Sequence, residues 1–189
     1  MEDETQHAAV GAGPLLQRDY WAAFAETSLS PSQLMAHVKS RFCELPPPAL
    51  VNFQAPGGVG RNAELDIQIT GAQDCRVRVV HDDPQSLTLG TLDGHPEAGR
   101  ITFGAYRHAT GRVIFHIRSR ARSATATHLL GFLTVGEAMQ TNTWTDFINR
   151  TAASTGLRID GAIRATTEAV DDTPEDDSFD CPTFHATGD

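Results

Sequence analysis

Two residues in the middle of the chain have side chains that could transfer protons. His95 and Glu97 lie in the segment Leu89–Gly99, which reads LGTLDGHPEAG. An imidazole titrates near neutral pH, so it could act with a carboxylate as a general acid and base if both groups faced one pocket. The glycines and the proline of the segment support a second interpretation, a turn in which Glu97 accepts hydrogen bonds from loop amides. The sequence leaves both interpretations open.

The sequence lacks the other common signatures of catalysis and cofactor binding. The glycine-rich run 56–60 is not followed by Gly-Lys-Ser/Thr, so it is not a phosphate-binding loop, and no Gly-x-Ser-x-Gly nucleophile motif occurs. The three cysteines, Cys43, Cys75 and Cys181, are odd in number and far apart, which suggests neither a disulfide framework nor a zinc site. We therefore predict no metal and no cofactor.

The charge of the chain argues against a nucleic-acid partner. Its 189 residues carry 24 acidic and 15 basic side chains, a net charge of −9. Arg118, Arg120 and Arg122 form a basic cluster, but no aromatic residues interleave with it. No stretch approaches the roughly 20 apolar residues of a membrane span, and the acidic start is unlike a secretion signal. We expect a cytoplasmic protein that binds no nucleic acid.

Composition predicts one domain between two acidic ends. Hydrophobic residues make up 40% of the chain, which is enough for the core of a single domain over residues 14–166. Residues 1–13 are small, polar and acidic, and we expect a disordered arm. The tail 167–189 has seven acids and no base between Glu168 and Asp180, which predicts a second disordered segment. Alternatively, the tail docks on the basic part of the domain or on a partner.

Apolar side chains recur at every second position through most of the domain, which is the period of a half-buried strand. The pattern predicts strands at residues 17–26, 63–69, 75–79, 86–92, 100–107 and 112–120. In the last of these, His116 and Arg118 fall on the side opposite Phe115 and Ile117, so we expect them to face solvent or another chain. A segment at 157–165 could add a final strand or turn.

Two segments have the apolar spacing of helices. Ser30-Pro31 is typical of a helix start, and the pattern continues to Pro46. The long segment 124–155 is expected to be helical, with an apolar stripe formed by Leu129, Leu133, Trp144 and Phe147. Gly136 and Gln140 interrupt that stripe, which indicates that something other than tight packing lies opposite. The order of elements predicts an α+β fold, a curved antiparallel sheet wrapped around one long C-terminal helix.

The segment Leu89–Gly99 also carries a resemblance to a known family. With Val79-Val80 before it and Val113 to Arg118 after it, it resembles an uncharacterised bacterial and plant domain family with a Gly-Thr-Leu-x-Gly-His-Pro-Glu-x-Gly motif. That family is associated with the START-like, or SRPBCC, superfamily of helix-grip folds, which includes aromatic polyketide cyclases and birch-pollen-type ligand carriers. The resemblance covers about Val79 to Ser119, and it implies a cavity between sheet and helix.

The first functional hypothesis is a domain that binds a small hydrophobic molecule in this cavity. The expected apolar lining comes from the sheet and the helix and consists of Leu65, Ile67, Val77, Leu89, Phe103, Phe115, Ile117, Met139 and Trp144. Tyr20, Thr91 and Gln140 are the expected polar contacts. Two alternatives stay open for single residues, because Trp144 could be an ordinary core residue and Gln140 a core glutamine with protein partners.

The second hypothesis is a cofactor-independent cyclase, dehydratase or hydrolase that acts on an apolar, polyketide-like substrate in the same cavity. There, His95 or Glu97 would move a proton, and the exclusion of water would suppress side reactions. The third hypothesis is an interaction module that works through the acidic tail and the arginine-rich face. A homodimer is compatible with each of the three.

Overall fold

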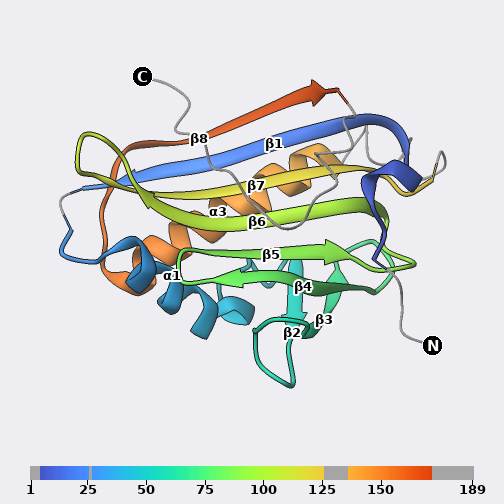
Figure 1. Ribbon diagram of the computed structural model, residues 1–189, viewed down its shortest axis with the longest axis horizontal. Coiled ribbons are helices and arrows are strands. Elements are labelled where there is room, and N and C mark those ends of the chain that lie inside the picture. Colours follow the sequence, from blue (N-terminus) through green and yellow to red (C-terminus); the bar gives the residue numbers. More distant parts are fainter. Residues whose placement is uncertain (1–4, 26, 126–135, 172–189) are drawn as a thin grey trace.

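One antiparallel sheet of eight strands organises residues 5–25, 27–125 and 136–171, which are the residues that the computed structural model describes (Figure 1). Each strand is hydrogen-bonded to its neighbours in the sheet. In spatial order the strands are β2 (Val51–Gln54), β3 (Glu64–Ile69), β4 (Cys75–Asp83), β5 (Ser86–Thr91), β6 (Glu97–Arg107), β7 (Val113–Ser123), β1 (Ala12–Phe24) and β8 (Ile159–Val170).

Two α-helices lie on the same face of the sheet, behind the strands in Figure 1. The first, α1 (Pro31–Ser40), begins as predicted from Ser30-Pro31. Ser30 Oγ accepts a hydrogen bond from the Gln33 amide at 3.2 Å, and Gln33 Oε1 accepts one from the Ser30 amide at 2.8 Å, which satisfies two exposed donors of the first turn. The second, α3 (Glu137–Thr155), runs along the sheet. Short 3₁₀ turns are η1 (Ala8–Val10) and η2 (Phe42–Glu44).

The main core lies between the inner face of the sheet and the C-terminal half of α3. Phe147 of α3 packs against Phe103 of β6 with ring centroids 5.2 Å apart, and against Phe115 of β7 at 6.2 Å. Phe42 of η2 joins the same group, 5.0 Å from Phe103. These buried rings and the aliphatic residues around them supply most of the apolar burial.

The predicted fold, a curved antiparallel sheet that grips a C-terminal helix, is confirmed. The structure describes only part of the segment 124–155 that was predicted to be helical. β7 continues to Ser123 and α3 begins at Glu137, while Leu129 and Leu133 of the predicted stripe lie outside the described residues.

Ordered structure also extends beyond the predicted domain limits. η1 and the start of β1 fall within the range 1–13 that was expected to be an arm, and β8 reaches Val170 within the range expected to be a tail. β8 follows α3 and pairs with β1 along most of its length, so it forms one edge of the sheet.

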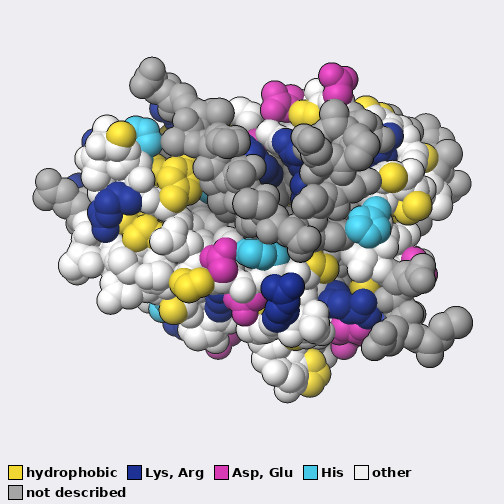
Figure 2. Space-filling view, viewed as in Figure 1, with side chains coloured by type: hydrophobic (Ala, Val, Ile, Leu, Met, Phe, Trp, Pro, Cys, Tyr) yellow, Lys and Arg dark blue, Asp and Glu magenta, His cyan; other side chains and the backbone are white. Residues whose placement is uncertain are grey.

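The described surface carries few large apolar side chains. Val10 is the exposed large hydrophobic residue of the described part, at 69% exposure. On the face shown in Figure 2, hydrophobic side chains of the described residues are scattered among charged ones. No helix within the described ranges is long and apolar enough to span a bilayer.

Candidate functional site

Two adjoining cavities lie between the sheet and the N-terminal half of α3. Their volumes are about 70 Å³ and about 110 Å³. They meet at six residues that line both, namely Phe53, Ile67, His95, Glu97, Gln140 and Trp144. The smaller cavity also reaches Val77 and Leu89, and the larger one reaches Met139. The sheet therefore packs tightly on one half of α3 and leaves space beside the other half.

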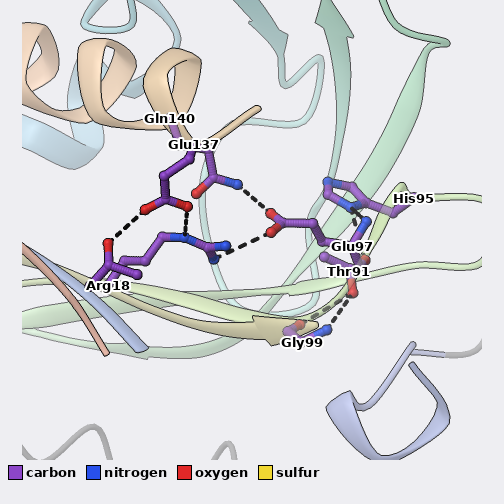
Figure 3. A network of polar contacts seen from close by, with 8 residues as sticks. Arg18, Thr91, His95, Glu97, Gly99, Glu137 and Gln140 are labelled. Atoms are coloured by element: carbon purple, nitrogen blue, oxygen red, sulfur yellow. Dashed lines mark hydrogen bonds and ion pairs between the residues drawn. The ribbon is translucent and has the colours of Figure 1, made fainter. Parts of the chain in front are cut away.

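A buried ionic cluster lies beside these cavities (Figure 3). Arg18 shares the inward face of β1 with Tyr20, and its side chain is only 1% exposed. Its Nη1 lies 3.3 Å from Glu97 Oε1, and its Nε donates to Glu137 Oε2 at 2.9 Å. A buried guanidinium requires such partners, because it loses its hydration. Thr167 Oγ1 donates to Glu137 Oε1 at 2.6 Å, so the cluster joins β1, β6, α3 and β8.

Glu97 is the carboxyl group of this cluster that lines the cavities. Its side chain is 14% exposed, and Gln140 Nε2 donates to its Oε2 at 2.5 Å. Burial raises the pKa of Glu97, the Arg18 charge and the Gln140 hydrogen bond oppose the shift, and the nearby Glu137 adds to it. The net pKa is above the ordinary value. Glu97 can therefore hold a proton at a pH where an exposed glutamate has lost it.

The ring of His95 is hydrogen-bonded to the backbone of the turn. Its Nδ1 accepts a hydrogen bond from the Glu97 amide at 3.0 Å and lies 2.9 Å from the Glu97 carbonyl oxygen. The ring lines both cavities. His95 and Glu97 thus face one site, as the acid/base hypothesis required. The turn interpretation erred in one detail, because the Glu97 carboxylate contacts Arg18 and Gln140 rather than loop amides.

Thr91 and Gly99 hold the two ends of the turn together. Thr91 Oγ1 accepts a hydrogen bond from the Gly99 amide at 3.0 Å and lies 3.2 Å from the Gly99 carbonyl oxygen. Gly99 has a φ of 150°, and a Cβ there would lie 2.2 Å from the carbonyl oxygen of Arg120. Only glycine permits this approach of β6 to β7. The contact fixes the strand two residues beyond Glu97.

The structure brings together some of the predicted ligand-contacting residues and not others. Those that line the cavities are Ile67, Val77, Leu89, Thr91, Met139, Gln140 and Trp144, together with His95 and Glu97. Those that lie in the packed core, outside the lining of both cavities, are Tyr20, Leu65, Phe103, Phe115 and Ile117. Burial raises the pKa of Tyr20 to about 12, although Thr141 and Arg18 lower it in part, so the phenol stays neutral.

Several residues of the site, Arg18, Phe53, Arg100 and Glu137 among them, were not predicted from the sequence. Arg18 and Glu137 complete the ionic cluster, and Phe53 lines both cavities. Arg18 precedes Tyr20 by two positions in an alternating strand, so its inward direction was readable from the sequence. Phe53 lies in β2, which is only four residues long, so its alternation was too short to predict a strand.

The opposite face of the sheet holds a second polar cluster. Asp19 Oδ1 accepts hydrogen bonds from His116 Nε2 and from Arg118 Nε, both at 2.6 Å. Burial raises the pKa of Asp19, but these two hydrogen bonds outweigh it and leave the pKa below the ordinary value. His116 is only 4% exposed, so the expectation that it faces solvent or another chain is wrong. Its pairing with Asp19 allows this burial.

Two of the three cysteines lie in the described part of the chain. Cys43 and Cys75 are free thiols, and burial raises the pKa of both, to about 12 for Cys75. Cys181 lies outside the described residues. Within those ranges no three His, Cys, Asp or Glu side chains are grouped as metal ligands would be.

Several solved structures are similar to the chain. Protein Ms6760 from Mycobacterium smegmatis is 13% identical, with a TM-score of 0.50 over 73% of this chain and 89% of that one. Norcoclaurine synthase from Thalictrum flavum, solved in complex with dopamine and hydroxybenzaldehyde, is 9% identical, with a TM-score of 0.54 over 77% of this chain and 92% of that one. The di-domain ARO/CYC StfQ of the steffimycin biosynthetic pathway is 11% identical, with a TM-score of 0.52 over 74% of this chain and 50% of that one.

At these identities the similarity establishes the helix-grip fold and nothing further. No curated protein matches the sequence. The model of the family described as a domain of unknown function, DUF1990, matches residues 43–150, which are more than half of the chain and include the turn that holds His95 and Glu97. The chain therefore belongs to the DUF1990 family.

Proposed function

We propose that this protein binds a small, mainly apolar molecule in the two adjoining cavities between the sheet and α3. The observation that supports this function is the composition of the lining. Six strands and α3 contribute apolar side chains, among them Phe53, Val77 and Trp144, while the polar groups of His95, Glu97 and Gln140 gather where the cavities meet. An apolar pocket with a few convergent polar groups is typical of ligand sites.

The cavity volumes favour a guest of modest size. A cavity of about 150 Å³ holds a benzene ring. Each of the two cavities is smaller than that, at about 70 Å³ and 110 Å³, but they adjoin at six shared residues. Together they offer room on the order of one aromatic ring or a short branched chain. A larger ligand would place only its end here.

Titration with toluene, followed by calorimetry or by methyl NMR, tests this function. We expect saturable binding to the wild-type protein and its loss in Val77→Phe, because the larger side chain fills the smaller cavity. Val10→Phe makes the same change at a residue that is 69% exposed, and it should bind toluene as the wild type does. Absence of toluene binding in the folded wild type, or equal binding in folded Val77→Phe, would contradict the proposal.

Acid/base catalysis by Glu97 is a second candidate function, and the raised pKa of this cavity-lining carboxyl supports it. A buried carboxylic acid that keeps its proton can protonate a leaving hydroxyl group, as a dehydration requires. We favour Glu97 over His95 as the proton carrier, because burial raises the pKa of this carboxyl group beside the cavities. The fold is compatible with catalysis, since a synthase shares it.

The Glu97→Gln variant distinguishes the two candidate functions, ligand binding and acid/base catalysis. Native mass spectrometry of the purified protein would first identify a co-purifying molecule. If Glu97 transfers a proton, the wild type converts that molecule, whereas Glu97→Gln still binds it without converting it. Equal conversion by both proteins would remove Glu97 from the chemistry, and binding without conversion by both would leave binding as the function.

A further inference from the structure

The amide of Gln140 has one satisfied end and one unsatisfied end. Its Nε2 donates to Glu97, whereas its Oε1 is buried and accepts no hydrogen bond from the described part of the chain. Buried polar atoms are nearly always paired, so an acceptor left in this state destabilises the unliganded protein. Gln140 lines both cavities, so a molecule bound there would lie beside this side chain.

The direction of the amide follows from the chemistry of its neighbour. An ionised carboxylate can only accept hydrogen bonds, so it requires the nitrogen end of Gln140 to face it. Figure 3 shows this end directed at Glu97, with the other Glu97 oxygen toward Arg18. The oxygen of Gln140 therefore stays available as an acceptor as long as Glu97 is ionised.

The charge of the ionic cluster disfavours an anionic group beside Gln140. Arg18 lies between Glu97 and Glu137 and contacts both, so its single positive charge is already matched by two carboxyl groups. Thr167 and Gln140 add neutral contacts to these carboxyls. An anionic ligand beside Glu97 and Gln140 would lose its hydration and would meet two carboxyl groups that share one guanidinium. Arg100 lines the smaller cavity alone, so this argument applies to the region where the two cavities meet.

We infer that the ligand of the proposed binding site is a neutral molecule whose hydroxyl group donates a hydrogen bond to the Oε1 of Gln140. This inference rests on the proposed binding function and specifies its ligand class: a small apolar body that carries one hydroxyl group. The apolar walls contact the body, and Gln140 distinguishes it from a hydrocarbon of the same shape.

The test compares three probes, phenol, toluene and benzoate, by calorimetric titration at about pH 8. Phenol and toluene differ by a hydroxyl in place of a methyl group, so the ratio of their affinities reports the hydrogen bond. In Gln140→Met, which keeps the shape and removes the acceptor, we expect the phenol-to-toluene ratio to fall about tenfold. Gln85→Met makes the same change in an exposed turn and should leave the ratio unchanged. Benzoate should bind the wild type at least tenfold more weakly than phenol.

Each outcome bears on one of the two proposals. Toluene binding with an equal ratio in the wild type and Gln140→Met would overturn the inference and leave the binding function intact. Failure of both phenol and toluene to bind the wild type would overturn the binding function and the inference with it. Benzoate binding tighter than phenol would overturn the exclusion of anions.

A measurement on the wild type covers the case in which Gln140→Met does not fold. Phenol should shift the side-chain amide NMR resonances of Gln140 well beyond the shift caused by toluene at equal occupancy. Equal shifts from the two probes would contradict the inference.

Discussion

The two halves of α3 face the same sheet but meet it differently. In the C-terminal half, Phe147 and Ile148 are fully buried against the aromatic core. In the N-terminal half, Gln140 and Trp144 are half-buried beside the cavities, and Glu137 joins an ionic cluster. The comparison shows how one helix serves two purposes, because one half provides the packing and the other leaves space for a guest.

The largest expected effect comes from truncating aromatic residues in the two halves. Phe147→Ala should lower the free energy of unfolding by about 4 kcal/mol, because it opens a cavity inside a packed aromatic group. Trp144→Ala should cost less, although it removes a larger side chain, because Trp144 is only partly buried and already borders empty space. Denaturant unfolding of both variants measures the difference. An equal cost would show that the N-terminal half is packed as tightly as the C-terminal half.

Removing the cation of the ionic cluster should have the next largest effect. Arg18→Met leaves Glu97 buried beside Glu137 without a positive partner, at a cost of about 3 kcal/mol near neutral pH. Arg112→Met breaks an ion pair with Asp160 at the surface and serves as the matched control, with a cost of less than about 0.5 kcal/mol. Urea unfolding of both variants measures the two costs. Equal costs would show that the buried ionic cluster stabilises the protein no more than a surface ion pair does.

Two leucines of β5 allow packed core and cavity to be compared within one strand. Leu87 and Leu89 share the inner face, but only Leu89 lines a cavity. Leu87→Phe should destabilise the protein by about 2 kcal/mol through overpacking, whereas Leu89→Phe should cost less, because its ring enters existing space. Thermal unfolding measures both. The prediction fails if Leu89→Phe is the more damaging of the two.

The smallest expected effect is a pH dependence that belongs to Glu97. Its pKa in the folded protein is raised above the ordinary value of 4.5, so the folded state holds the proton more strongly than the unfolded state. The stabilisation is fully present below about pH 4.5 and is lost as the pH rises through the folded pKa. One group can contribute at most about 1.4 kcal/mol per pH unit.

The difference in unfolding free energy between the wild type and Glu97→Gln isolates this contribution from other titrating groups, such as Asp19 with its lowered pKa. Urea unfolding at intervals between about pH 4 and pH 8 should show the wild type losing stability relative to Glu97→Gln as the pH rises. A gain with rising pH would mean that Arg18 dominates and lowers the pKa of Glu97.

Much of the sheet was predictable because alternation is a local property. The period of two identified the inner residues of β3 to β7, and the same count places Arg18 beside Tyr20 on the inner face of β1. The Ser30-Pro31 start of α1 was equally local. β8 was harder to predict, because most of its side chains are exposed and its apolar pattern is weak.

The cavities and their polar contacts depend on distances that no local pattern contains. Gln140 and Glu97 are 43 residues apart in the chain, and Arg18 and Glu137 are 119 apart. The polar residue Gln140 in the apolar stripe did indicate that part of α3 is not tightly packed. It did not indicate that Glu97 and Arg18 lie nearby. Which of the aromatic residues border space and which fill the core follows from how the helix lies on the sheet.

A substitution at Gly99 would disturb the site, although Gly99 does not line the cavities. A methyl group there would collide with the carbonyl oxygen of Arg120 and force the two strands apart. Glu97 begins the same strand, so its carboxylate would move away from both the guanidinium and the amide that hold it. The position of the Glu97 carboxylate thus depends on the absence of a Cβ atom at Gly99, two residues along the strand.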